Sequence, residues 1–227
     1  MTTPLPLTGL RVLAFEQYGA GPFGTQFLAD LGAEVIKVEA PGHGDDTRGW
    51  GPPFVGPDDD SVSTYYLSCN RNKESVTADL KTDDGRAVLE GLVRRADVLL
   101  ENFRPGALDR RGFGLDRLHE LNPGLVVLSI TGFGHDGPEG DRAGYDQIAQ
   151  GEAGLMSITG PGGQPTRVGV PIGDLLAGMY GAFGVLAALL DRERTGRGTV
   201  VRTSLLAAIG GVIERHMIEI GFLQPQQ

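Results

Sequence analysis

A glycine-rich turn between two apolar segments is the first pattern in the sequence that suggests chemistry. Residues Gly19–Gly24 match the pattern G-x-G-x-x-G and follow the strand-like run Leu10–Phe15. An acidic residue, Glu39, comes 20 positions after Gly19, at the end of the next strand-like run. This spacing is typical of dinucleotide binding, in which a helix N-terminus holds the pyrophosphate and the acid holds a ribose.

The same turn has a simpler interpretation, because glycines let any backbone turn sharply. Pro22 also lacks one of the helix-start N–H groups that a pyrophosphate would use, which counts against a dinucleotide. The residues of the turn by themselves leave both alternatives open.

A second candidate is a carboxylate at the start of a long apolar segment. Asp174 follows Gly173 and precedes the uncharged run Leu175–Leu190. A helix N-terminus favours negative charge and supplies positive potential where an oxyanion develops, so an aspartate there can serve as a nucleophile. Aspartate is also a very common N-cap, and the sequence by itself favours that structural role.

Other reaction classes lack their usual residue patterns. The single cysteine, Cys69, excludes an internal disulfide and a multi-cysteine zinc site. The histidines form no H-E-x-x-H pattern, and G-x-S-x-G does not occur, so metal and serine hydrolases have no support. We expect no bound metal and no tightly bound cofactor.

The elements that must position these residues alternate between strands and helices. We expect strands at Leu10–Phe15, Glu34–Val38, Ser75–Asp79, Asp97–Glu101, Leu125–Ile130 and Thr199–Thr203. We expect helices at Pro22–Leu31, Asp83–Arg95 and Leu115–Asn122, and from Tyr145, Asp174 and Leu205. This order predicts an α/β fold, a Rossmann-like open and mainly parallel sheet with helices on both faces. Two aperiodic stretches, Ala40–Ser61 and Gly132–Gly144, are expected to be functional or mobile loops.

Composition narrows the class of protein further. The 227 residues carry a net charge of −9, which argues against nucleic acid as a partner because phosphate backbones require a basic face. The 16-residue apolar run after Asp174 is shorter than the roughly 20 residues that span a bilayer. With one free cysteine and no basic segment before the first apolar run, we expect a cytoplasmic protein without a membrane segment.

Seven separated blocks carry a resemblance to a known family. They are, in chain order, LTGLRVLAF, AGPFGTQFLADLGAEVIKVEAPGHGD, NRNKESVTADLKTDDGR, ADVLLENFRPGALDRRGFG, SITGFGHDGP, GYDQIAQGEAGLMSITG and GDLLAGMYGAFGVLAALLDRERTGRG. These blocks resemble the family III CoA-transferases, the group of formyl-CoA transferase and the carnitine CoA-transferases. The resemblance implies that the glycine turn serves coenzyme A (CoA), not a nicotinamide.

The resemblance also implies a role for each matching residue. Asp174 falls on the nucleophilic aspartate, which would carry a mixed anhydride and an aspartyl-CoA intermediate while CoA moves between an acyl-CoA and a free carboxylic acid. The matching CoA-binding positions are Gly19, Ala20, Ala40, Ala78, Asp79, Leu80, Lys81, Asn102, Phe103, Arg104, Arg110, Ala143, Gly144, Tyr145 and Asp146.

Several of these residues have ordinary alternatives. Arg104 and Arg110 suit CoA phosphates, since guanidinium groups form charge-assisted hydrogen bonds, but both are also typical surface charges. Asp146 suits a helix cap equally well, and Lys81 suits a solvated lysine. Tyr145 bears on the reaction type, because the racemase branch of the family carries histidine there. Tyrosine, with a pKa of about 10, is a poor base and favours transfer over racemisation.

Three departures from the family keep alternatives open. Formyl-CoA transferase has glutamine at the position of Gly19, so specificity for oxalate and formate is in doubt. Ala40 lacks the basic side chain that some members carry. Family members are nearly twice as long as this chain. The alternatives are therefore a racemase-like relative, or a truncated CoA-binding module without activity.

The length difference sets the expected domains and assembly. Residues 1–200 are expected to form the large CoA-binding domain, and residues 201–227 to lead toward a small domain that is largely missing. The resemblance implies an interlocked homodimer. Because the helices Leu175–Leu190 and Leu205–Leu223 are apolar on most sides, this chain alone is not expected to be a stable, fully active monomer.

Overall fold

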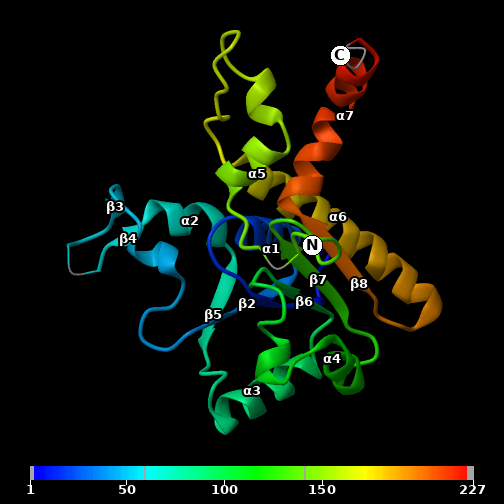
Figure 1. Ribbon diagram of the computed structural model, residues 1–227. Coiled ribbons are helices and arrows are strands. Elements are labelled where there is room, and N and C mark those ends of the chain that lie inside the picture. The colour runs from blue at the N-terminus through cyan, green and yellow to red at the C-terminus, as the bar shows by residue number, and fades with distance from the viewer. Residues whose placement is uncertain (1–2, 59, 141, 224–227) are drawn as a thin grey trace.

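The fold is built on a six-stranded, entirely parallel sheet (Figure 1). The computed structural model describes residues 3–58, 60–140 and 142–223. The strands of the sheet are β1 (Arg11–Phe15), β2 (Glu34–Glu39), β5 (Lys73–Thr77), β6 (Val98–Glu101), β7 (Val126–Thr131) and β8 (Val200–Ser204). Each lies within two residues of its predicted position. The central strands β1, β6 and β7 are buried and read as continuous apolar runs, whereas the edge strands β5 and β8 are more exposed.

The order of the strands identifies the architecture. Across the sheet they run β5-β2-β1-β6-β7-β8, the arrangement of a Rossmann-type doubly wound fold. The chain moves outward from β1 to β2 and β5, then returns to the other side of β1 with β6. The predicted α/β fold is therefore confirmed. Ligands in such sheets bind outside the carboxyl ends of the strands where the direction reverses, here between β1 and β6.

Helices cover both faces of the sheet (Figure 1). They are α1 (Ala20–Asp30), α2 (Thr64–Asn70), α3 (Asp83–Val93), α4 (Leu115–Leu121), α5 (Asp146–Glu152), α6 (Ile172–Thr195) and α7 (Leu205–Leu223). Helices α1 and α6 pack on one face, and α3 and α4 on the other. Helix α7 follows β8 directly and extends away from the sheet beside α5 and α6.

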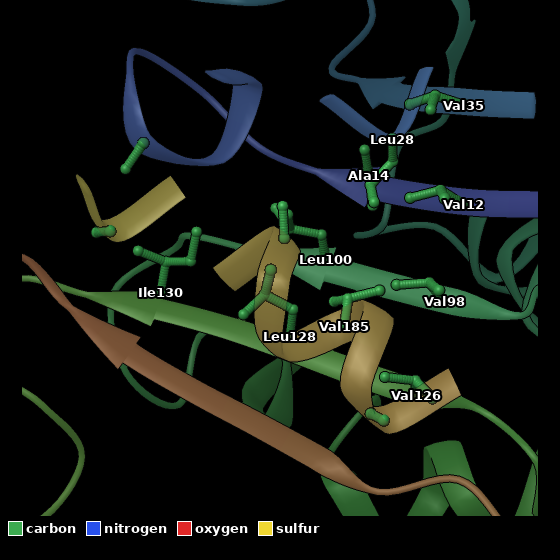
Figure 2. Close-up of a cluster of buried hydrophobic side chains, with 14 of the residues drawn as sticks. Val12, Ala14, Leu28, Val35, Val98, Leu100, Val126, Leu128, Ile130 and Val185 are labelled. Carbon is green, nitrogen blue, oxygen red and sulfur yellow. The ribbon is translucent and has the colours of Figure 1, made fainter. Parts of the chain in front are cut away.

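The alternation of strand side chains creates two separate cores. On the α1 and α6 side, Val12, Leu100 and Leu128 meet Leu28 and Val185 (Figure 2). On the α3 and α4 side, neighbouring strand residues pack against those helices. Because successive side chains of a strand point to opposite faces, both cores come from the same short runs.

The stretch predicted as one long loop holds more structure than expected. Within Ala40–Ser61 lie a 3₁₀ turn (Asp46–Gly49) and strand β3 (Phe54–Val55), which pairs with β4 (Val62–Ser63) in a small hairpin. Helix α2 follows and was not predicted. Two-residue strands and a seven-residue helix are too short to show hydrophobic periodicity, which explains the omission.

Helix α6 has one buried and one exposed side. By length and composition it passes for a membrane span, but its contacts with α1, β7 and β8 identify it as a core helix. Its outer side exposes 72% of both Phe183 and Leu190. The predicted domain boundary at residue 200 falls at the start of β8, and residues 224–227 of the second segment lie outside the described residues.

Candidate active site

Glycines bring helices α1 and α6 into backbone contact. A Cβ atom added to Gly178 would lie 2.6 Å from the carbonyl oxygen of Ala20 and 3.0 Å from the amide nitrogen of Gly24. Only glycine permits so close an approach of two helices. The first turns of both helices therefore lie together near the carboxyl end of β1, beside the point where the strand order reverses.

Asp174 lies one helical turn before Gly178, on the same side of α6. Its carboxylate reaches the backbone of Gly19, the N-cap of α1. A Cβ atom added to Gly19 would lie 2.5 Å from Oδ2 of Asp174. The structure thus brings together the predicted nucleophile and the glycine turn, although 155 positions separate them in the sequence.

Asp146, and not Asp174, caps helix α6. Helix α6 begins at Ile172, so Asp174 stands inside the first turn. Oδ1 of Asp146 accepts hydrogen bonds from the amides of Gly173 at 2.6 Å and Asp174 at 3.3 Å, while Gln150 donates to Oδ2 at 2.6 Å. The cap interpretation of Asp174 is therefore wrong. Both carboxylate oxygens of Asp146, a residue predicted at the CoA site, accept hydrogen bonds from groups of the protein itself.

The Asp174 carboxylate is left without a donor. No group among the described residues hydrogen-bonds to it or forms an ion pair with it. Burial raises the pKa of Asp174 to about 7, and the charge of Asp146 adds to the effect. A carboxyl group that is half ionised near neutral pH and makes no hydrogen bond to the protein is available to react with a ligand that enters the site.

Three aromatic side chains form a cluster next to the glycine turn, and sequence reasoning missed all of them. The ring of Trp50 lies 5.6 Å from that of Tyr18 and 5.1 Å from that of Tyr65, centroid to centroid. Burial raises the pKa of Tyr65 to about 12, with contributions from Cys69 and Asp174. Tyr18, next to Gly19, has a φ of 67°, which is rare for a bulky residue. The sequence did offer one signal of this cluster, since the only tryptophan of the chain lies in an otherwise aperiodic loop.

The segment after β6 connects to the glycine turn through one amide. The side chain of Asn102 accepts from the amide of Gln17 at 3.0 Å and donates to the carbonyl of Gln17 at 2.8 Å. Asn102 thus holds the β1 turn across the switch point. Phe103 packs edge-on against Phe15, while Arg104 and Arg110 are exposed, and Arg104 has no polar partner among the described residues.

The remaining predicted CoA positions lie at the ends of neighbouring elements. Ala40 follows β2 and is half-buried, and Ala78–Lys81 follows β5 in a turn where the amide of Lys81 donates to Asp79. Gly144 packs against the backbone of Gly132, where neither residue has room for a side chain. Tyr145 is the largely exposed N-cap of α5. These positions are placed by the fold, but their contact with CoA stays a prediction.

Glu39 disfavours the dinucleotide alternative, since every acceptor it could offer a ribose is already used. Its carboxylate accepts from Arg48 at 2.6 and 2.8 Å, from Ser75 at 2.7 Å and from the amide of Asp45 at 2.7 Å. Burial alone would raise its pKa, but these donors outweigh burial and lower the pKa to about 2. A ribose would have to displace Arg48.

A cavity of about 440 Å³ lies between α4 and the strands β6, β7 and β8, but Asp174 does not line it. Its polar lining includes Glu101, Ser129, His135 and Arg202. Burial raises the pKa of Glu101, which accepts from Ser129 and from the amide of Phe103. Asp174 thus lies between the starts of α1 and α6, separate from this cavity.

Together these features define a Rossmann-type domain. Near its switch point the carboxylate of Asp174 is free of protein donors among the described residues, whereas Glu39, the acid that would bind a dinucleotide, is fully occupied. The chain belongs to CoA-transferase family III, whose family model matches residues 7–227. It is 48% identical over 92% of its length to a succinate–glutarate CoA-transferase of Agrobacterium fabrum, and 47% identical over 89% to a formyl-CoA:oxalate CoA-transferase of Streptomyces avermitilis. The family prediction is confirmed.

Solved structures agree with the sequence comparison. A CAIB/BAIF family protein from Brucella suis matches 96% of this chain with a TM-score of 0.92 and 43% identity. The chain spans 58% of that protein, and 53% and 48% of the two transferases. It therefore represents about half the length of these relatives.

Proposed function

We propose that this chain carries the nucleophile and part of the CoA site of an enzyme that transfers CoA between an acyl-CoA and a free carboxylic acid. The observation that carries the proposal is the half-buried Asp174 carboxylate, which lacks a hydrogen-bond donor among the described residues and touches Gly19 where two helices begin. The family membership supports the same reaction class. The named relatives are transferases, which does not favour the racemase alternative.

In the proposed reaction, an oxygen of Asp174 attacks the thioester carbonyl. A C–O bond forms, the C–S bond breaks, and the CoA thiolate leaves with the electron pair, which gives a mixed anhydride. The thiolate then attacks the aspartyl carbonyl and releases the first acid, so that Asp174 carries CoA as a thioester. A second carboxylate attacks this thioester, and the returning thiolate takes the new acyl group and restores Asp174.

The surroundings of Asp174 suit these steps. Helices α1 and α6 both begin beside the carboxylate, so their N-terminal dipoles favour the oxyanion of each tetrahedral intermediate. We propose that the acyl-CoA and acid are substrates, that the active form is a homodimer, and that it works in the cytoplasm.

Chemical trapping tests this proposal directly. The full-length protein that contains this chain is incubated with a radiolabelled acyl-CoA and then with hydroxylamine or borohydride. Peptide mass mapping is expected to find hydroxamate or reduced aspartate at Asp174. The Asp174→Asn variant gives no adduct, and Asp191→Asn, at the other end of α6, serves as the matched control. Full turnover by Asp174→Asn would refute the nucleophile assignment.

A further inference from the structure

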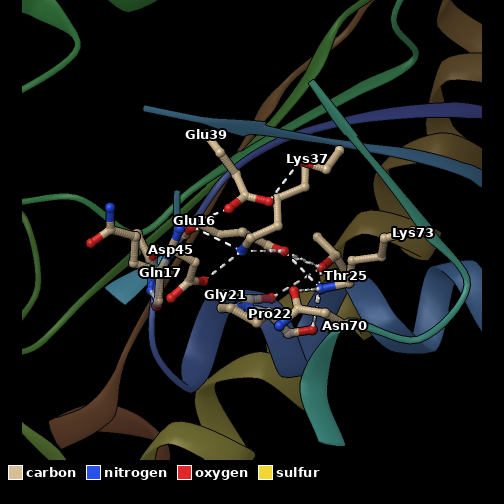
Figure 3. A network of polar contacts seen from close by, with 12 residues as sticks. Glu16, Gln17, Gly21, Pro22, Thr25, Lys37, Glu39, Asp45, Asn70 and Lys73 are labelled. Atoms are coloured by element: carbon tan, nitrogen blue, oxygen red, sulfur yellow. Dashed lines mark hydrogen bonds and ion pairs between the residues drawn. The ribbon is translucent and has the colours of Figure 1, made fainter. Parts of the chain in front are cut away.

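A buried charge network lies behind the aromatic side chains, and the proposed reaction does not use it (Figure 3). Its centre is Lys37 on β2, whose side chain is 1% exposed. The ammonium group donates to the carbonyl oxygen of Glu16 at 3.0 Å, pairs with Asp45 at 2.8 Å and lies 3.6 Å from the carboxylate of Glu16. Burying an ammonium group costs free energy unless the group is paired, so the burial of Lys37 indicates a specific structural role.

Lys73 completes the charge balance of the network. Its ammonium group pairs with Glu16 at 2.7 Å and donates to the carbonyl of Pro22 at 2.8 Å. Thr25 donates to the same carboxylate from helix α1. Two buried carboxylates thus face two buried ammonium groups. Glu16 is held by β5 and α1, whereas Asp45 is held by Lys37.

Lys37 joins the turn after β1 to the Asp45–Trp50 segment. Glu16 directly follows β1 and is itself followed by the turn Gln17–Gly19, whose last residue touches Asp174. Asp45 caps the 3₁₀ turn by accepting from the amide and hydroxyl of Thr47 at 2.9 and 2.8 Å. Beyond that turn the chain leads directly to Trp50.

The same two segments meet again at the surface. The hydroxyl of Tyr18 donates to Asp46 at 2.7 Å, and the ring of Tyr18 packs against Trp50. One inner ion pair and one outer hydrogen bond therefore connect the Asp45–Trp50 segment to the β1 turn, while the Asp45 amide and Arg48 attach the same segment to Glu39 on β2. The left-handed backbone of Tyr18 needs such external support, because this conformation costs about 1–3 kcal/mol in isolation.

We propose that the buried Lys37–Asp45 ion pair is a positioning pair that holds the Asp45–Trp50 segment on the turn Gln17–Gly19, whose last residue touches Asp174. Its catalytic consequence rests on the proposed function, but the positioning itself does not. When the pair is removed, the segment loosens on the β1 turn although Glu39 still holds it, and water gains further access to Trp50, already 44% exposed, and to the Asp174 carboxylate.

Two readouts test the positioning without any transferase assay. Trp50 is the only tryptophan, so intrinsic fluorescence reports on its surroundings alone. The titration of Asp174 is followed by carboxyl ¹³C NMR and assigned with Asp174→Asn. The test variant is the charge-balanced double substitution Lys37→Met with Asp45→Asn. The control is Arg192→Met with Asp97→Asn, which removes a partly buried pair at the opposite end of the strands.

In the test variant we expect red-shifted Trp50 emission, stronger acrylamide quenching, and an Asp174 proton affinity that falls about tenfold, one pKa unit. The control variant leaves both readouts at wild-type values. If the double variant does not fold, Asp45→Asn alone gives the same readouts, because Lys37 keeps its contacts with Glu16. A folded test variant with unchanged Trp50 emission and unchanged Asp174 titration overturns the proposal. That result would leave the trapping experiment on Asp174 unaffected.

Discussion

Asp146 and Asp174 are linked by one hydrogen bond and by electrostatic repulsion. Oδ1 of Asp146 lies 3.3 Å from the amide nitrogen of Asp174 and accepts its hydrogen, while the negative charge of Asp146 raises the pKa of the Asp174 side chain. The residue that starts helix α6 therefore also adjusts its candidate nucleophile. This arrangement has a cost in stability that depends on pH.

Asp174→Asn is expected to stabilise the chain at alkaline pH and to have little effect at acidic pH. The folded-state pKa of about 7 lies above the unfolded value of about 3.8, so the folded state binds the proton more tightly. Wild-type stability accordingly falls as the pH rises from about 4 to 7, by about 4 kcal/mol in total. Thermal unfolding between pH 4 and 9 measures the difference. Asp191→Asn is the control, and a difference that is constant with pH would contradict the assignment.

Gly19→Ala is expected to reorient Asp174 without unfolding the protein. The added Cβ atom would lie 2.5 Å from Oδ2, at the movable end of a side chain, so the carboxylate must rotate. Misplacement of a reacting group by about 1 Å costs up to about a hundredfold in rate. We expect the rate of adduct formation at Asp174 in the full-length protein to fall by that order. Gly49→Ala, whose Cβ atom meets nothing within 4 Å, is the control.

Gly178→Ala is expected to destabilise the fold itself. Here the added Cβ atom would meet the backbone of α1, which cannot move without separating the helices. Overpacking of this kind costs about 1–3 kcal/mol. Urea unfolding measures the loss, and Gly91→Ala, in open space on α3, is expected to be neutral or stabilising. Equal stability of the two variants would show that α1 and α6 are not tightly packed.

Arg104→Ala and Arg110→Ala are each expected to weaken CoA binding about tenfold, as for a lost charge-assisted hydrogen bond. Both side chains are exposed near the switch point, where the phosphates of CoA would lie. Calorimetric titration of CoA at two salt concentrations measures the effect, which should shrink at high salt. Arg194→Ala, an exposed arginine at the far end of α6, should not change the affinity.

The outer side of α6 is expected to drive self-association of this chain. Phe183 and Leu190 are each 72% exposed, seven residues apart on one side of the helix. Light scattering of the wild-type chain should show dimers or larger species, and Phe183→Ser with Leu190→Ser should reduce their mass. Val88→Ser, on the exposed side of α3, is the comparison. A monodisperse wild-type monomer would contradict this prediction, because it would show that the exposed apolar side of α6 does not cause self-association.

Sequence patterns predicted the centre of the sheet well because the strands β1, β6 and β7 are buried on both faces. Val126–Thr131, for example, is buried at every position. The patterns failed where short elements are held by specific polar contacts. The 3₁₀ turn at Asp46–Gly49 depends on Asp45, which depends in turn on the distant Lys37. No local pattern encodes such a pairing.

The candidate site was only partly predictable for the same reason. The family resemblance identified Asp174 and Gly19, and the structure places them in contact. Neither spacing nor resemblance revealed that Asp146 caps α6 or that Asn102 holds Gln17, because those side chains act across crossover connections. Trp50 escaped notice because it lies in an aperiodic loop, and Tyr65 because helix α2 is too short to show hydrophobic periodicity.

The carboxylate of Glu39 already accepts hydrogen bonds at both oxygens, which restricts how this domain could acquire a ribose contact by mutation. In a dinucleotide enzyme the acid at the end of the second strand is free, so cofactor preference can drift through changes at that single position. Here Arg48, Ser75 and the Asp45 amide all depend on Glu39, and Asp45 in turn pairs with Lys37. A mutation that freed Glu39 for a ribose would also loosen the segment that leads to Trp50.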